Sequence, residues 1–479
     1  MNATPELSHR RRLGILAICC SSLLIVAMDN TIVNVALPSI RSDLHASLSG
    51  LQWTVDAYTI VIASFLMLAG STGDRLGRKR TFQTGLCVFA AASLGCSLAP
   101  TLGWLIAARA VQGVGGSMLN PVAMSIITNV FTDPRERGRA IGAWGATVGI
   151  SLALGPIVGG ALTEAVDWRA IFWINVPIAL AAVVLTALYV PESRAARPRR
   201  LDPVGQLLVI VTLAAVTYGI IDAPSAGWVS AQTLALFAVS ASALAFLVAY
   251  ELRRREPLIE PRFFRSPPFA GATMIAVCAF AGFAGFLLIN TLYLQDVRGY
   301  SPLEAGLCTL PMAILAGLLA PVSGRIVGTR GARPALLFGG ICMAVAPLLL
   351  VDLSATTPLV LLLGVYALYG MGFGAMNPPI TYTAVSGMPD SQAGVAAAVA
   401  STSRQVGQTL GVAIIGSIVG TAAGAAGGRG LAAATHPAWW VIGACGASVL
   451  ALGAASTGVR AQRAARRAAA ALQAEAQPA

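Results

Sequence analysis

The chain has 479 residues, of which 56% are apolar before its 50 glycines are counted, and only 11% are charged. Soluble domains have roughly 45–50% apolar residues with glycine included and roughly 25% charged residues, so this composition excludes a soluble globular protein. The net charge of +12 is better explained by basic loops at one membrane face than by nucleic-acid binding.

Fourteen stretches are apolar and long enough to be helices that cross a bilayer, which takes about 20 residues. In chain order they cover 13–37, 50–70, 81–100, 103–126, 140–163, 168–190, 203–222, 232–251, 268–293, 303–324, 334–352, 357–380, 394–420 and 436–457. The sequence therefore predicts an all-α membrane protein with 14 transmembrane helices.

Lys and Arg are distributed unevenly among the segments that connect these spans. With the N-terminus in the cytoplasm, 26 of the 32 basic residues lie in inside segments, four lie in outside loops, and Arg109 and Arg404 lie within spans. Cytoplasmic loops are enriched in basic residues, so we expect a multi-pass protein of the cytoplasmic membrane with both termini inside.

Charged residues within the early spans are the first candidates for function. Asp29 lies in the first span, Asp56 in the second and Arg109 in the fourth. A charge in hydrocarbon is costly and is usually functional or paired. At 1.5 Å per residue the three lie at similar depths, about 9 to 12 Å from the outer ends of their spans. They are predicted to meet, either as a proton-coupling group or as a fixed structural ion pair.

The segment after the second span combines glycines with charges. It contains Gly73, Asp74, Arg75, Gly77 and Arg78. Glycine permits a tight turn between helices, and Asp74 can pair with a nearby Arg or cap a helix. Such an ion pair can form in one state of a transporter and break in another. The alternative is a basic inside loop that only sets topology.

An internal repeat links the two ends of the chain. Gly113, Gly115, Asn120 and Pro121 in the fourth span recur 257 residues later as Gly370, Gly372, Asn377 and Pro378 in the twelfth. The matched spans are eight apart, so two helices are inserted between six-helix repeats, the parallel halves typical of one transporter class. The predicted divisions are a six-helix bundle at 1–200, two added helices at 201–266, a second bundle at 267–459 and a basic tail at 460–479.

Other polar residues within spans are candidates for a substrate cavity, although hydrogen bonds between helices explain them equally well. These are Asn30, Asn34, Gln112, Asn120, Asn290, Asn377 and Arg404. Arg404 has no acidic residue within the spans of its own half. It is expected to bind helix carbonyls, to bind an anionic substrate, or to extend toward the cytoplasm. The two carboxylates of the first spans, taken alone, slightly favour neutral or monocationic substrates over dications.

These motifs together resemble the major facilitator superfamily, over nearly the whole chain. Residues 73–80 are similar to its signature loop. Residues 28–38, 52–58 and 109–116 resemble motifs of the 14-helix drug:proton antiporter branch, in which the arginine corresponding to Arg109 is implicated in proton coupling. The motif characteristic of antiporters in the fifth helix is matched by Gly145, Gly149, Gly155, Pro156 and Gly159. A degenerate second copy of the signature loop, at 324–328, has no acidic residue.

The resemblance implies a transporter that exports drugs, antibiotics or related small molecules in exchange for protons, without a cofactor or metal, and that acts as a monomer. A proton-coupled carrier of a metabolite or nutrient and a membrane sensor that moves nothing are the alternatives. An ATP-driven pump is disfavoured, because the only lysine, Lys79, follows Arg78 rather than the glycine of a phosphate-binding loop. No catalytic or metal-ligand constellation stands out among the three histidines and eight cysteines.

Overall fold

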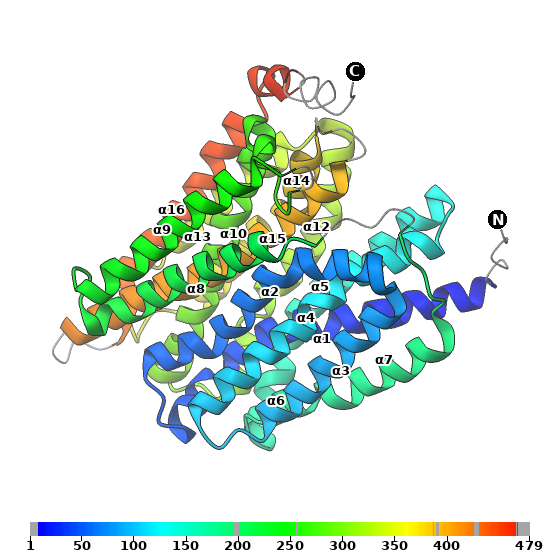
Figure 1. The fold of residues 1–479 in the computed structure, drawn as a ribbon. Helices are drawn as coiled ribbons and strands as arrows, with labels where there is room; N and C mark the ends of the chain where they lie inside the picture. The colour runs from blue at the N-terminus through cyan, green and yellow to red at the C-terminus, as the bar shows by residue number, and fades with distance from the viewer. Residues whose placement is uncertain are drawn as a thin grey trace.

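The computed structural model describes residues 8–195, 201–254, 257–386, 388, 392–425, 431–465 and 467. Within these residues the chain is helical and contains no strand (Figure 1). Its helices are α1 (His9–Asp43), α2 (Leu48–Leu76), α3 (Arg78–Ser97), α4 (Leu102–Val130), α5 (Pro134–Ala165), α6 (Ala170–Trp173), α7 (Asn175–Tyr189), α8 (Pro203–Ala226), α9 (Ala231–Glu251), η1 (Pro261–Arg265), α10 (Pro267–Leu292), η2 (Tyr293–Val297), α11 (Pro302–Cys308), α12 (Leu310–Arg330), α13 (Arg333–Leu348), α14 (Leu359–Val385), α15 (Ala393–Ala425) and α16 (Leu431–Ser456).

Side-chain caps define where many of these helices begin. The Ser47 side chain accepts from the backbone of Gly50 at the start of α2, and Asp133 caps α5 immediately before a proline at its first position. Ser301 and Glu304 form a reciprocal capping box at the start of α11. Such caps satisfy backbone N–H groups that have no partner within the helix, so short polar segments can end one apolar helix and begin the next.

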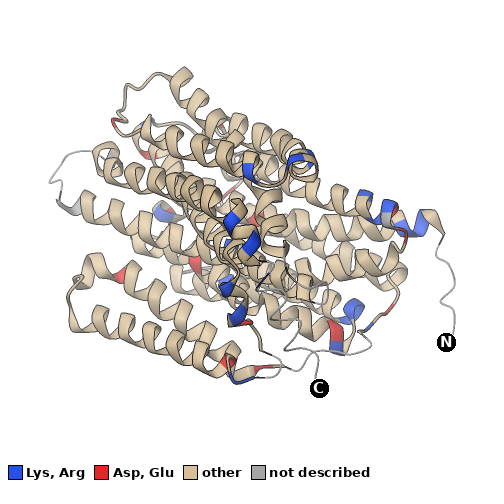
Figure 2. Cartoon of the chain, turned by 90° about the horizontal axis from the view of Figure 1, so that it is seen from above, with Lys and Arg blue, Asp and Glu red and all other residues tan. Residues whose placement is uncertain are grey.

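Helices occupy all of the ranges predicted as spans, two of them as broken pairs, α6 with α7 and α11 with α12. By length and composition, 11 described helices can cross a membrane, and α13 is a shorter apolar helix. The chain is therefore a multi-pass membrane protein, while the number of crossings stays a prediction. Along the helices charged residues are sparse (Figure 2).

The same pattern of helix packing appears on both sides of the inserted pair. In the first half α1 packs on α5, and α4 packs on both α2 and α3; in the second half α10 packs on α15, and α14 packs on both α12 and α13. One large apolar cluster draws its buried members from 263–449 and another from 15–190. The repeat read from glycines thus corresponds to a repeated helix arrangement, whereas the exact domain boundaries stay a prediction.

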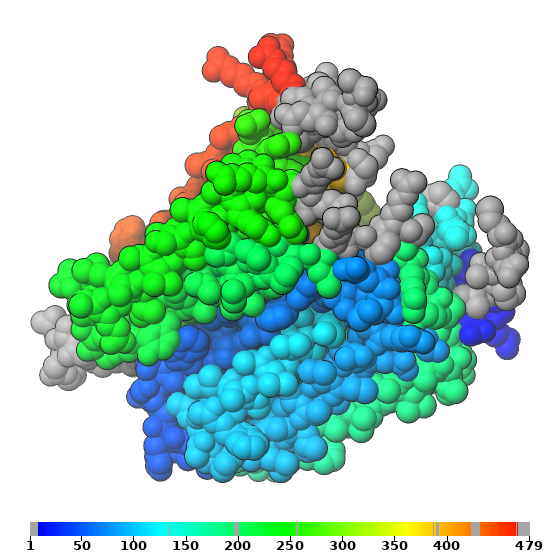
Figure 3. Space-filling model, viewed as in Figure 1, coloured from blue at the N-terminus to red at the C-terminus, as the bar shows by residue number. Residues whose placement is uncertain are grey.

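Helices α8 and α9 form a hairpin at the side of this assembly. Figure 3 shows them, in green, lying along the blue surface that includes α2. Gln206 of α8 donates to the backbone oxygen of Ser64 in α2 at 2.6 Å. Farther along α8, Ile220 and Ile221 pack with Ala413 of α15. The hairpin therefore contacts both halves.

The two halves are joined toward one end of the bundle, away from the start of α1. Arg41 pairs with Asp296 at 3.4 Å, and the Gln52 side chain donates to the backbone oxygen of Ala413 at 2.9 Å. A third link is between the hydroxyls of Thr59 and Thr409, 2.9 Å apart. Among the described residues, every hydrogen bond between the halves lies in that end or the middle of the helices.

Candidate functional site

A buried ion pair joins α1 to α4 inside the first half. Arg109 donates through Nη1 to Oδ2 of Asp29, and the two side chains are 1% and 0% exposed. The sequence placed these residues at similar depths, and the structure brings them into direct contact. Removing either partner would leave a charge buried without compensation, which is strongly destabilising.

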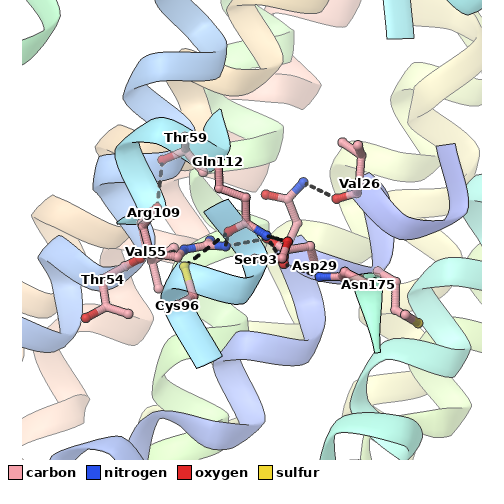
Figure 4. A network of polar contacts seen from close by, with 12 residues as sticks. Val26, Asp29, Thr54, Val55, Thr59, Ser93, Cys96, Arg109, Gln112 and Asn175 are labelled. Carbon is pink, nitrogen blue, oxygen red and sulfur yellow. Dashed lines mark hydrogen bonds and ion pairs between the residues drawn. The ribbon is translucent and has the colours of Figure 1, made fainter. Parts of the chain in front are cut away.

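Three further polar side chains complete the network around the carboxylate (Figure 4). Gln112 donates to Asp29 Oδ1 at 3.0 Å and accepts from Arg109 Nη1 at 2.7 Å. Its amide also donates to the hydroxyl of Ser93 on α3 at 2.9 Å. Asn175, at the start of α7, donates to Asp29 Oδ1 at 3.1 Å. Four helices therefore contribute to the network, and the ionised carboxylate of Asp29 accepts three hydrogen bonds, from α4 and α7.

The guanidinium of Arg109 is also held from the side of α2. Its Nε donates to the backbone oxygen of Thr54 at 3.1 Å, and its central guanidinium carbon, Cζ, lies 4.1 Å from the ring centre of Tyr58. A cation over an aromatic face gains electrostatic stabilisation that is larger when the pair is shielded from water. The arginine is thus fixed by α1, α2 and α4 together.

Glycines allow these helices to approach closely enough for the network to form. A Cβ at Gly113 of α4 would lie 2.7 Å from the backbone oxygen of Tyr58 in α2. In α5, Gly155 faces Thr31 and Gly159 faces Ile32, both on α1. Small residues at these positions bring backbones together, as is common between membrane helices.

Asp56 does not join the pair. It is fully buried, its Oδ1 accepts from the Thr59 hydroxyl at 3.4 Å, and its Oδ2 has no hydrogen-bond partner among the described residues. The positions of Gln52, Asp56 and Thr59, four and three residues apart, place them on one face of α2, which meets α15. The expected meeting of all three charges is therefore seen for two of them only.

The signature segment is more helical than its sequence suggested. Gly73, Asp74 and Arg75 belong to the last turn of α2, and Arg78 begins α3. Only Gly77 lies between the helices, with φ +117°, a conformation that favours glycine. Hydropathy marks the part of a helix that lies in lipid, so the extension of α2 beyond its apolar stretch was missed.

Charges in this segment pair with each other and with a distant residue. Arg78 Nη2 donates to Asp74 Oδ1 at 2.9 Å. Glu192, after α7, accepts from the backbone N–H groups of Lys79 at 3.1 Å and Arg80 at 3.3 Å, at the start of α3. The predicted pairing of Asp74 with an arginine is present in this structure, and whether it breaks in another state stays a prediction.

The glycines of the helix 5 motif have different surroundings. Gly149 lies near the backbone of Gly317 in α12, and the backbone oxygen of Pro156 lies against Gly306 in α11. Gly145 has no other group within 4 Å of its side-chain position. Most of the motif therefore serves helix packing, against α1 on one side and the second half on the other.

The remaining candidate polar residues are dispersed. Asn30 and Asn34 donate to backbone oxygens of α1 itself, at 3.1 and 2.9 Å. Asn290 donates to its own helix and accepts from the Tyr366 hydroxyl at 2.6 Å. The side-chain oxygen of Asn120 has no partner among the described residues, and the Asn377 backbone oxygen accepts weakly from Arg404, at 3.5 Å. Their role in a cavity stays a prediction.

Two contributors were not singled out as site residues from sequence. Asn175 was noted only as part of a motif, yet it donates directly to Asp29. An amide within an otherwise apolar span was the available signal. Glu192 lies 113 residues from the backbone group it binds, and nothing local in the sequence indicates that contact.

Comparison of the chain with known proteins identifies its family. Residues 19–412 match the model of the Major Facilitator Superfamily. The chain is 36% identical over 393 residues to the multidrug resistance protein Stp of Mycobacterium tuberculosis, covering 82% of this chain and 73% of Stp. It is 35% identical over 394 residues to the tetracenomycin C resistance and export protein of Streptomyces glaucescens, covering 82% of this chain and 73% of that protein. It is also 35% identical over 401 residues to the multidrug efflux pump LfrA of Mycolicibacterium smegmatis, covering 84% of this chain and 79% of LfrA.

Among solved structures, a D-xylose-proton symporter superposes with a TM-score of 0.65 at 15% identity, covering 92% of this chain and 97% of the symporter. At that identity the match establishes the fold only. Proteins of the matched family are transporters and not enzymes. With the family model covering most of the chain and relatives above 30% identity along most of their length, the protein belongs to the major facilitator superfamily.

Proposed function

We propose that this protein exports drugs, antibiotics or related small molecules across the cytoplasmic membrane in exchange for protons. The observation that carries the proposal is the fully buried Asp29, whose carboxylate is balanced by Arg109 and bonded by two amides. The names of the relatives, which describe multidrug resistance, antibiotic export and drug efflux, support the class of substrate.

The coupling we propose follows from the chemistry of that carboxylate. Ionised Asp29 attracts Arg109 and accepts three hydrogen bonds, so the network favours the state seen here. A protonated Asp29 loses the attraction to Arg109, and the helices α1 and α4 are then held less tightly. A ligand that binds one state better shifts the population toward it, and the proton is such a ligand.

Asp56 is the second candidate for proton binding. It is a buried carboxylate on the face of α2 that meets α15, and its Oδ2 has no partner among the described residues. Burial without a counter-charge favours the neutral form of a carboxyl group. Protonation of Asp56 would therefore stabilise the contact between the halves at this end.

The finer topology belongs to the same proposal. We place 14 helices in the membrane with both termini in the cytoplasm, since helices occupy all of the predicted ranges and the basic residues are biased to the inside segments. The protein acts as a monomer, driven by the proton gradient without a cofactor. In this orientation the halves are joined at the outer end, so the structure represents a state closed to the outside.

Transport in inverted membrane vesicles tests the proposal. Adding an exported drug, such as ethidium, to vesicles with an imposed pH gradient should partly collapse the gradient and concentrate the drug inside. Vesicles carrying Asp29→Asn are the matched control. Uptake that persists after a protonophore abolishes the gradient would rule out proton exchange. Movement of solute in the opposite direction would instead support the importer, and no movement of any solute in a drug and metabolite panel would support the sensor.

A further inference from the structure

Arg404 is the second arginine within the predicted spans, and its surroundings differ from those of Arg109. It lies on α15, 11 residues from the start of the helix, which at 1.5 Å per residue is about 16 Å along the axis. Its side chain points to α14, where Nη2 donates to the Thr381 hydroxyl at 2.5 Å. The residue is partly exposed, unlike Arg109.

The positive charge of Arg404 is not balanced by the described part of the chain. Its hydrogen-bond partners are neutral oxygens, the hydroxyls of Thr381 and Ser401 and the backbone oxygen of Asn377, the last two at 3.3 and 3.5 Å. No ion pair to it is found among the described residues, and its Nε has no acceptor there. A guanidinium offers five N–H donors, and the three bonds made here use only Nη1 and Nη2, so donors remain unused, among them that of the buried Nε.

An aromatic surface lies next to the guanidinium. The central guanidinium carbon of Arg404, Cζ, is 5.9 Å from the ring centre of Phe280 on α10, and Phe280 is itself partly exposed. The ring centre of Phe373 on α14 lies 5.1 Å from that of Phe280, in an edge-to-face arrangement, and Phe373 stacks on Phe283 with 4.1 Å between ring centres. A planar ring placed against Phe280 would therefore have its substituents near the cation.

The helices that surround Arg404 correspond to those of the first-half network. By the offset of the repeat, α14 is the counterpart of α4, which carries Arg109, and α10 packs with α14 as α1 packs with α4. Arg404 contacts α14 at Asn377 and Thr381, 11 and 15 residues beyond Tyr366, the counterpart of Arg109, so its site lies about 16 Å or more along α14 from the position that matches the coupling site. The contact with the Asn377 carbonyl is long, so binding to helix carbonyls does not account for Arg404, and its shortest hydrogen bond is to Thr381, four residues before the end of α14.

We infer that Arg404 and Phe280 form a substrate subsite for an aromatic organic anion, with the guanidinium on a carboxylate or phenolate oxygen and the ring on Phe280. The planar fork of arginine matches a carboxylate, and arginine also lies favourably against aromatic faces. This deepens the proposed export function by naming a substrate class. It also qualifies the expectation from sequence, which counted only carboxylates and so favoured neutral or monocationic substrates.

Binding to the purified full-length protein tests the inference without a proton gradient. The probes share one ring system and differ in charge: 2-naphthoate, 2-naphthalenemethanol and 2-naphthylmethylammonium. The protein is held in nanodiscs of phosphatidylcholine, so that no anionic lipid competes for Arg404, and affinity is measured by isothermal titration. We expect 2-naphthoate to bind most tightly, and Arg404→Gln to weaken its binding about tenfold or more while changing 2-naphthalenemethanol by less than about twofold.

Two further variants separate a local role from a general one. Arg330→Gln removes the same charge from an exposed position at the end of α12 and should leave all three affinities unchanged. Arg404→Lys should keep the preference for the anion in weaker form. Equal affinity of wild-type protein for the three probes, or an equal loss for all three in Arg404→Gln, would overturn the inference. A wild-type protein that shows no charge preference but exports drugs in exchange for protons would refute this subsite alone. A wild-type protein that shows a clear preference but exports nothing would refute only the export function.

Discussion

The two halves of the molecule solve the same packing problem with different chemistry. In the first half α4 is bonded to α1 through Arg109 and Asp29, and in the second half α14 is bonded to α10 through Tyr366 and Asn290, with the hydroxyl donating at 2.6 Å. Tyr366 lies 257 residues after Arg109, the offset of the glycine repeat. A polar bond between these helices is therefore part of the shared fold, but a charged one is not.

The difference between the charged pair of the first half and the neutral bond of the second bears on why the first half carries charges at all. A neutral hydroxyl-to-amide bond joins the helices without the desolvation cost of two ions, so structure alone does not require the pair in the first half. Tyr369, the counterpart of Gln112, stacks on Phe286 at 4.1 Å instead of joining a polar network. The comparison supports the proposal that proton coupling resides in the first half, because the matching positions of the second half carry a neutral bond and an aromatic stack.

The largest expected effect comes from neutralising the charged half. Asp29→Asn keeps the size of the side chain but removes the group that can ionise, so uphill export should fall at least about tenfold, to background. The measurement is drug accumulation in inverted vesicles at matched expression. Tyr366→Phe, which alters the equivalent bond of the second half, should retain export. Full proton-coupled export by Asp29→Asn would remove the proposed distinction and make Asp56 the next candidate.

Stability should respond unequally in the two halves as well. Arg109→Gln leaves the Asp29 carboxylate buried without its counter-charge and should destabilise the protein by roughly 3–5 kcal/mol. Tyr366→Phe leaves only a neutral acceptor unpaired, at a cost of about 1–3 kcal/mol. Thermal unfolding in detergent, followed by fluorescence, gives the order of the two variants.

A double variant checks the cause of that loss. Asp29→Asn with Arg109→Gln removes both charges together and should recover much of the stability lost in Arg109→Gln, while export stays absent. If the double variant is no more stable than Arg109→Gln, the loss arises from packing rather than from an uncompensated charge.

The signature segment offers a third contrast, because only the first half has an acidic residue there. Asp74→Asn removes the ion pair with Arg78, a partly exposed pair worth at most about 1 kcal/mol, so unfolding should change little. We expect slower turnover with unchanged substrate affinity, measured as rates and binding on the same preparation. Normal turnover would show that the charges set topology only.

The smallest effect is expected from a matched pair of glycines. A Cβ at Gly73 would lie 3.0 Å from Val122 Cγ2, whereas nothing lies within 4 Å of that position at Gly324. Gly324→Ala should therefore stabilise α12 by roughly 0.5–1 kcal/mol through helix propensity, and Gly73→Ala should be neutral or destabilising. The measurement is the melting temperature of each variant relative to the wild-type protein. Equal shifts for the two variants would show that the close contact at Gly73 relaxes freely.

Sequence reasoning was most successful where lipid imposes a simple rule. Apolar stretches located the helices, and the offset of Gly113 and Gly370 identified the repeat, because both signals can be read directly from the order of residue types along the chain. The rarity of charge within spans also led to Asp29 and Arg109. The sequence could not show that Asp56 lies apart from Asp29 and Arg109, because the depth of a residue along α2 does not reveal which neighbouring helix its side chain faces. Asn175 was missed although an amide in an apolar span was a signal, and nothing in the sequence near Glu192 indicates its partner 113 residues away.

The hairpin of α8 and α9 has a mechanical consequence. Near its start α8 is bonded to α2 through Gln206 and Ser64, and near its end Ile221 packs with Ala413 of α15, where Trp53 of α2 also lies. If α2 and α15 separate, α8 cannot keep all of these neighbours. The hairpin must move with one half and slide over the other, so any separation of α2 from α15 requires α8 to exchange its contacts with one of them.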